Sequence, residues 1–193
     1  VLVSGAGATL KAESVLFLGC GEQQPQMSCA YRGGAIFARD GAAVHVTAST
    51  FQSWTSHSTG GAIYADGVAT ACTILGTVFE ANMAFHGGAV SSANMMDMSV
   101  VDSTFEGNTA HGGAIVAIAG ASSLGPRRFS GVHFLRNKVD STRHGVVDMR
   151  GDVLGASLTV EASTFKGNEA PSDVLVEPAE VMFAHFGAEG TIN

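Results

Sequence analysis

The sequence predicts an all-β fold, a parallel β-helix of about six three-sided coils, on three observations. Glycine is frequent and no stretch keeps a 3.6-residue apolar spacing for long, which excludes a helical repeat. A Gly-Gly-Ala-Ile/Val motif recurs along the chain, at 33–36, 60–63, 87–90 and 112–115, with a degenerate copy at 144–147. A Phe-x-x-Asn motif alternates with it, at 79–82, 105–108, 134–137 and 165–168.

Three short strands are expected in each coil. Pairs of apolar residues stand five and seven positions before a phenylalanine, at Val44 and Val46, Cys72 and Ile74, Met98 and Val100, and Leu158 and Val160. Residues two apart share one face of a strand, so each pair points inward, and a bend must follow before the phenylalanine can do the same. The Ile or Val of the glycine motif supplies the third inward group. Stacked coils then place phenylalanine on phenylalanine and asparagine on asparagine.

The chain is expected to form one β-helix domain over residues 1–193, with clear repeats over 33–170. Phe17 opens the first coil, and insertions at 120–128 and 138–143 are expected to protrude from the stack. Residues 171–193 are expected to hold a last strand and a cap or tail. Because the chain starts directly in an apolar, strand-like segment without Met, we expect a fragment or a processed form of a longer protein.

Composition excludes several classes of function. The formal net charge is −7 and the pI is about 5.4, so no nucleic-acid-binding footprint is present. No apolar run approaches the roughly 18 residues of a membrane helix, and we expect no membrane span in this chain. There are 11 Phe against 2 Tyr and 1 Trp, which indicates that the aromatic residues lie mainly in the interior.

The tandem motifs resemble the repeat of the chlamydial polymorphic outer-membrane proteins and of related right-handed parallel β-helix proteins of the pectin-lyase-like fold. The resemblance covers roughly residues 33–170. It implies a right-handed coil and, often, the surface-exposed passenger of an autotransporter-type adhesin. An extracellular or cell-surface location is therefore expected, with a luminal compartment as the alternative.

Three functions stay open at this point. The first is a non-catalytic structural or protein-binding β-helix within a cell-surface, adhesin-like protein. The second is an accessory structural subunit of a larger assembly in a luminal or extracellular compartment. In both, the open helix ends expose strand edges that a protein partner or further β-helix coils would cover. The third is a polysaccharide-active enzyme, a lyase or glycosidase.

The enzyme alternative depends on carboxylates that converge in a groove. Asp40 and Asp66 follow successive glycine motifs, but both precede glycine, which is typical of turns. A lyase would need acidic calcium ligands and a basic residue, and only Asp148, Asp152 and Arg150 come near that set. We therefore expect no catalytic residue and no cofactor.

Four other sets of residues are candidates for binding or structural roles. His86, His111 and His144 lie at glycine motifs and could form a column that binds a transition metal, although a polar corner at which histidine is merely tolerated is the favoured explanation. The loop residues Gly125, Pro126, Arg127 and Arg128 form a basic tip that could dock to a negatively charged partner. Cys20 and Cys29 could form a structural disulfide, and Cys72 is expected to be buried.

Overall fold

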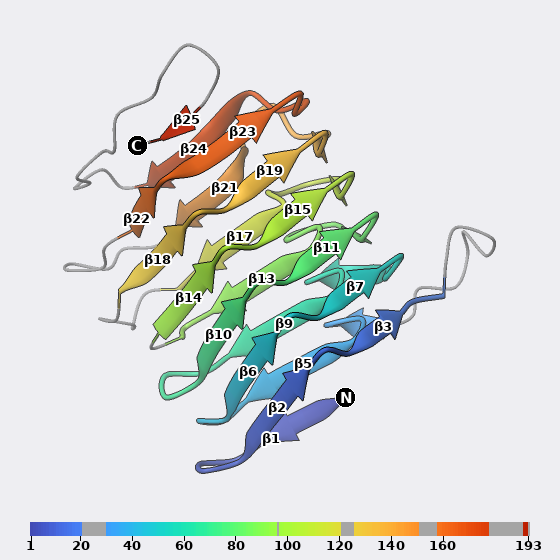
Figure 1. Cartoon of the computed structure of the whole chain (residues 1–193), viewed down its shortest axis with the longest axis vertical. Helices are drawn as coiled ribbons and strands as arrows, with labels where there is room; N and C mark the ends of the chain where they lie inside the picture. Colours follow the sequence, from blue (N-terminus) through green and yellow to red (C-terminus); the bar gives the residue numbers. More distant parts are fainter. Residues whose placement is uncertain (21–29, 96, 121–125, 151–157, 178–190, 193) are drawn as a thin grey trace.

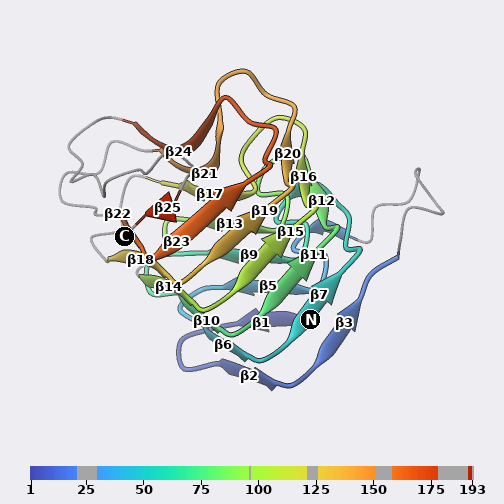
Figure 2. The ribbon, with the colours of Figure 1, turned by 45° about the horizontal axis from the view of Figure 1, so that its top comes forward.

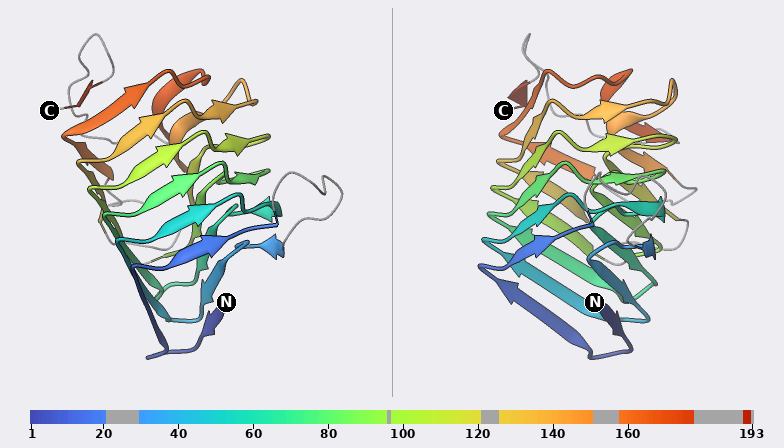
Figure 3. Two further views of the ribbon diagram at one scale, coloured as in Figure 1. Left: turned by 45° about the vertical axis from the view of Figure 1, so that its right-hand side comes forward. Right: turned by 90° about the vertical axis from the view of Figure 1, so that its right-hand side faces the viewer.

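The computed structural model describes residues 1–20, 30–95, 97–120, 126–150, 158–177 and 191–192, and within them it contains strands and no helices. The strands lie in regular coils that are stacked along one axis (Figures 1 and 3). Three sheets line the stack, and their members pair in parallel except for the last strand of the chain. The predicted all-β parallel β-helix is therefore confirmed, whereas its right hand and the number of about six coils stay predictions.

Sheet 1 follows the glycine motifs. It comprises β1 (Leu2–Ser4), β5 (Ile36–Arg39), β9 (Ile63–Asp66), β13 (Val90–Ala93), β17 (Val116–Ala119), β21 (Gly145–Arg150) and β24 (Ser172–Glu177). Sheet 2 holds the apolar pairs. It comprises β2 (Thr9–Glu13), β6 (Ala43–Thr47), β10 (Ala71–Leu75), β14 (Asp97–Val101), β18 (Arg127–Ser130) and β22 (Leu158–Glu161).

Sheet 3 holds the phenylalanines. It comprises β3 (Leu16–Leu18), β7 (Thr50–Gln52), β11 (Val78–Glu80), β15 (Thr104–Glu106), β19 (His133–Leu135), β23 (Ser163–Lys166) and the antiparallel β25 (Thr191–Ile192). Two short corner sheets lie between sheet 3 and sheet 1 along the chain, and the three-stranded one is labelled in Figure 2. They comprise β4 (Ala30–Arg32) with β8 (Ser56–Thr59), and β12 (Met83–Ala84) with β16 (Thr109–Ala110) and β20 (Lys138–Val139).

The core consists of like residues stacked on like. Neighbouring phenylalanine rings of sheet 3 lie 4.4 to 5.0 Å apart, and their planes differ by no more than 16°, from Phe17 through Phe51, Phe79, Phe105 and Phe134 to Phe165. In sheet 2, Cys72 pairs with both Val44 and Met98. The three inward groups expected in each coil are therefore present, and together they form one continuous apolar core.

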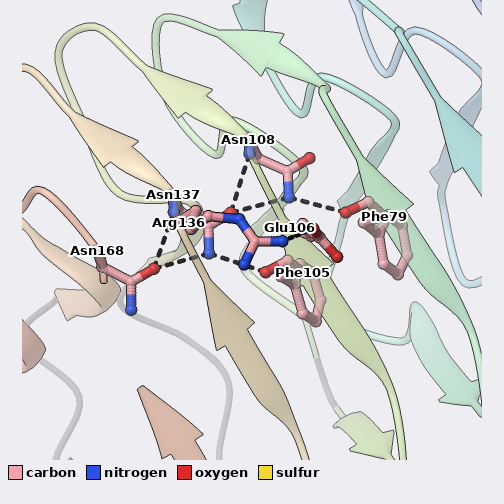
Figure 4. Close-up of polar contacts among 7 residues, drawn as sticks. All are labelled: Phe79, Phe105, Glu106, Asn108, Arg136, Asn137 and Asn168. Carbon is pink, nitrogen blue, oxygen red and sulfur yellow. Dashed lines mark hydrogen bonds and ion pairs between the residues drawn. The ribbon is translucent and has the colours of Figure 1, made fainter. Parts of the chain in front are cut away.

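A buried asparagine ladder fixes the corner after sheet 3 (Figure 4). Asn108 accepts hydrogen bonds from the backbone N–H and the Nδ2 of Asn82, at 2.9 and 3.0 Å. Its own Nδ2 donates to the carbonyl of Phe79 and to Oδ1 of Asn137, at 2.9 and 3.0 Å. The same contacts repeat from Asn137 to Asn168. The predicted asparagine column therefore bonds to both neighbouring coils, and on the surface beside it Arg136 forms an ion pair with Glu106.

The two glycines of the motif have different tasks. Gly60, the first of its pair, has a φ of +64°, a backbone conformation that residues with a Cβ adopt at a cost in free energy. Gly61, the second, has no room for a side chain, because an added Cβ would lie 1.9 Å from the carbonyl oxygen of Gly88 in the next coil. A turn and a close backbone approach thus explain why the pair recurs.

The register departs from the motif alignment at one step. The motif places Val90 opposite Ile115, whereas in the structure Val90 pairs with Val116. Val90 and Val116 are 26 residues apart, and so are Asn82 and Asn108, so the asparagine ladder keeps its register. The Gly-Gly pair of the motif at 112–115 is therefore displaced by one residue. This slip changes which histidines lie together.

Candidate functional site

A cavity of about 250 Å³ lies on the outer side of sheet 1, beside the corner through which the chain enters that sheet. Its floor is formed by the outward positions of β13 and β17, where the side chains are small. Ser91 and Ala93 on β13 pair with Ala117 and Ala119 on β17. The neighbouring strands carry larger groups at the same positions, namely Tyr64 on β9 and Asp148 and Arg150 on β21. The hollow therefore exists because two consecutive coils lack large outward side chains.

His86 and His144 form one wall of this cavity, together with Thr59 and Gly113. The two imidazole rings lie 6.2 Å apart between centroids and are inclined by 67°. His86 packs over Gly113. A Cβ added at Gly113 would lie 2.5 Å from Nδ1 of His86. Burial lowers the pKa of His86, and the neighbouring His144 lowers it further, whereas Asp148 acts in the opposite direction.

The third histidine of the predicted column lies elsewhere. His111 is exposed, its Nδ1 lies 2.8 Å from Oδ2 of Asp140, and its Nε2 lies 3.2 Å from the sulfur of Met83. Because of the one-residue slip, His144 is aligned with the first glycine of the motifs in the earlier coils. His111 is one position out of line with His86. Among the described residues, no group of three or more His, Cys, Asp or Glu could hold a metal ion. Metal binding by His86, His111 and His144 stays a prediction.

Asp148 is the buried charge of the cavity, with an exposed fraction of 3% although it points outward from sheet 1. It forms an ion pair with Nδ1 of His144. Both of its oxygens lie 3.0 Å from Nε of Arg150. Arg150 in turn donates to the carbonyl oxygen of Arg143. The carboxylate is thus paired with the guanidinium of Arg150 and bonded to the imidazole of His144, and a buried charge is tolerated when it is paired and hydrogen-bonded.

One polar atom at the cavity lacks a hydrogen bond. The hydroxyl oxygen of Thr59 is buried and has no partner. An unsatisfied buried hydroxyl costs about 1–3 kcal/mol, so native proteins seldom keep one without a reason. No sequence signal indicated the cavity itself.

An exposed aromatic surface adjoins the cavity, and we call it the corner ridge: Tyr31, Arg32, His57 and Phe85. Tyr31 is 66% exposed and Phe85 51% exposed. The guanidinium of Arg32 lies 5.9 Å from the ring centroid of Tyr31, and the rings of Tyr31 and His57 lie 6.2 Å apart. The ring of Phe85 lies edge-to-face against that of His86, at 4.7 Å. The expectation that the aromatic residues are interior is therefore wrong for these two.

Of the carboxylates that sequence reasoning weighed for catalysis, Asp40 lies in a turn and Asp66 is the last residue of β9. Asp40 is exposed, has a φ of +58°, and accepts a hydrogen bond from Ser4 at 2.8 Å. Asp66 accepts hydrogen bonds from the hydroxyl of Tyr64 and the amide of Asn94, at 3.3 and 3.4 Å. Asp152 lies outside the described residues. Among the described residues that line the cavity, Asp148 is the sole carboxylate.

The basic pair does not form a loop tip. Arg127 and Arg128 lie in β18, and Arg127 occupies an inward position between Met98 and Leu158. Its guanidinium is buried and donates to the carbonyl of Met95 at 2.8 Å, and burial lowers its pKa. Arg128 is exposed and forms an ion pair with Glu161. Gly125 lies outside the described residues and Pro126 directly precedes β18, so docking by this segment stays a prediction.

The cysteines lead to a testable prediction. Cys20 is disulfide-bonded, Cys29 lies outside the described residues, and their pairing stays a prediction. Burial raises the pKa of the Cys72 thiol to about 12. Since the thiolate is the reactive species, we expect no labelling of the native protein by a thiol reagent at pH 8, and one thiol per chain after denaturation without reductant. A count of three would contradict the disulfide, and labelling of the native protein would contradict the burial of Cys72.

Comparison with known proteins gives a match to a repeat family. A family described as the Chlamydia polymorphic membrane protein repeat matches residues 102–118, which contain one Phe-x-x-Asn motif and one Gly-Gly motif. No curated protein and no solved structure matches the chain. The protein is thus a parallel β-helix whose repeat resembles that of the chlamydial polymorphic membrane proteins. In the described part of the chain, no helix is long and apolar enough to cross a membrane.

Proposed function

On the premise that a polymorphic membrane protein repeat lies within this parallel β-helix, we propose that the chain is a non-catalytic, protein-binding segment of a cell-surface, adhesin-like protein. The stacked core and the asparagine ladder form a rigid support. The surface on that support, rather than a catalytic group, supplies the function. Among the described residues that line the cavity there is a single carboxylate, already paired with Arg150 and bonded to His144, which favours the absence of hydrolytic chemistry.

The corner ridge is the observation that carries this proposal. Tyrosine and arginine are the residues most enriched in the energetic centres of protein interfaces, and large exposed aromatic side chains are depleted elsewhere on soluble surfaces. Tyr31 and Arg32 contact each other on β4, and His57 and Phe85 extend the ridge across the next two coils. The partner would therefore be a protein whose apolar surface lies along three coils at this corner.

The test is the native mass of the protein from its own source, with mass spectrometry of everything that co-purifies. We expect a stoichiometric protein partner with the wild type. The double variant Tyr31→Ser/Phe85→Ser should weaken that complex roughly 30-fold or more, which corresponds to the loss of about 2 kcal/mol at a binding hot spot. Leu75→Ser is the matched control, because Leu75 is 42% exposed on sheet 2, away from the ridge, and it should leave the complex intact.

Two results would overturn the proposal. One is a wild-type protein that purifies alone. The other is a complex that the ridge variant and the control variant weaken equally. The surface location is tested separately, by labelling intact cells with an amine reagent that does not cross membranes. Exposed lysines such as Lys11 and Lys138 should then be modified before lysis, whereas modification only after lysis favours the luminal alternative.

A further inference from the structure

We propose that the cavity on sheet 1 binds one uncharged sugar residue, a ligand different from the protein partner of the corner ridge. The walls of the cavity are set by the fold rather than by a loop. Tyr64 on β9 and Asp148 on β21 bound it at two ends, and three strand spacings of about 4.8 Å separate these strands. All of these groups come from paired strands and their corners, so the cavity is preformed.

The size of the cavity limits the ligand. Its volume of about 250 Å³ lies just below the range of roughly 300–1,000 Å³ that is typical for drug-sized ligands. A single ring with its substituents fits this space, and an oligosaccharide does not. The floor of Ala93, Ala117 and Ala119 is apolar, so it favours a ring that presents a flat C–H face.

Charge decides against ionic ligands. The carboxylate of Asp148 already accepts from His144 and Arg150, and Arg150 also donates to the backbone of Arg143. An anion would have to displace Asp148 from its basic partners, and a cation would have to displace those partners from Asp148. An uncharged ligand leaves this network intact, whereas either kind of ion would leave a buried charge without its partner.

The polar groups of the wall match hydroxyls. Asp148 holds Nδ1 of His144, so Nε2 of a neutral His144 ring is an acceptor. The Thr59 hydroxyl at this wall is buried without a partner; turned toward a ligand in the cavity, it can both donate and accept. Ser91 adds a third group, a hydroxyl on the floor. A ligand that has one apolar face and several hydroxyls at its rim satisfies both the floor and the wall, and a sugar ring is such a ligand.

The test is a titration followed by NMR, with glucose, galactose, mannose, N-acetylglucosamine and their methyl glycosides as probes. We expect saturable shifts at Ser91, Gly113 and Ala117 with at least one probe, at a Kd of ~1 mM, the weak end of specific binding. Equal binding of the methyl glycoside would identify the terminal residue of a glycan as the source. Binding of the reducing sugar alone would identify a free monosaccharide.

Two variants locate the site. Ala117→Leu fills the floor from an outward position and should weaken binding more than tenfold, whereas Ala71→Leu makes the same change on the outer side of sheet 2 and should not. Thr59→Val removes the unpaired hydroxyl without changing the shape of the side chain. The variant should bind the sugar at least fivefold more weakly. Its melting temperature should be unchanged or higher, because a buried unsatisfied group is removed.

Three results would overturn this proposal while leaving the ridge untouched. The first is the absence of saturable shifts with every probe at ~10 mM, ten times the expected Kd. The second is undiminished binding by Ala117→Leu. The third is binding of glucuronate more than tenfold tighter than that of glucose, which would show that the site prefers an anion. Ridge variants should bind the sugar as the wild type does, so the two proposals can fail separately.

Discussion

Replacing Asn108 with alanine is expected to lower the free energy of unfolding by about 3–5 kcal/mol. The Asn108 side chain is fully buried and takes part in four hydrogen bonds, which join it to both neighbouring coils. Truncation leaves the backbone N–H of Asn82 and the carbonyl of Phe79 without these partners in a dry interior. Each buried group left unsatisfied costs about 1–3 kcal/mol, and a small cavity adds to that cost. Urea denaturation followed by circular dichroism measures the change.

Gln52→Ala is the control for this prediction. Gln52 also carries an amide, but it is only half-buried and its bond to Glu80, at 3.2 Å, lies on the surface. The free energy of unfolding should change by less than about 0.5 kcal/mol. If Asn108→Ala cost no more than Gln52→Ala, the asparagine ladder would not stabilise the stack.

Gly61→Ala is expected to destabilise the protein by about 3–5 kcal/mol, through a clash between two coils. The added Cβ would lie 1.9 Å from the carbonyl oxygen of Gly88 and 2.9 Å from the backbone nitrogen and oxygen of Met83. These are backbone atoms held in paired coils, so they cannot move aside without breaking the pairing. The melting temperature and the urea midpoint should both fall.

Gly107→Ala is the matched control for this clash. Gly107 has a φ of +61° but has nothing within 4 Å of an added Cβ. The paired position in the preceding coil is Ala81, which has a φ of +52°, so alanine already occupies this turn. We expect a loss of about 1 kcal/mol from the left-handed conformation alone. Equal losses for the two variants would mean that coil spacing at the motif is looser than the structure describes.

Most of the fold could be predicted because its determinants are local and repeated. The phenylalanine spacing predicted the stacked rings of sheet 3, and the pairs two residues apart predicted the inward positions of sheet 2. The register at Val90 could not be predicted from the motif, because the Gly-Gly pair at 112–113 is displaced by one residue and only the paired strands show which alignment holds. Arg127 was assigned to the insertion at 120–128, and its inward position was not predicted, since charged residues are rarely buried.

Little of the candidate site could be predicted from the sequence. The histidines at the glycine motifs gave a signal, but His86 and His144 come together only through the register slip that separates both from His111. The floor depends on Ala117 and Ala119, small residues whose significance appears only when Tyr64 and Asp148 are seen at either end. The corner ridge was missed because Tyr31 and Phe85 carry no repeat signature and most other aromatic residues are buried.

Hydrogen exchange of the asparagine side-chain amides tests most directly whether the coils stack in register. NMR spectra of the protein transferred to heavy water resolve these groups from the backbone amides. We predict that the Nδ2 protons of Asn82, Asn108 and Asn137 exchange as slowly as the backbone amides of β15, because both protons of each amide are hydrogen-bonded between coils. The exposed amide of Gln52 should exchange at once. Exchange of the three asparagines as fast as Gln52 would contradict the stacked ladder, and with it the arrangement of the cavity and the corner ridge.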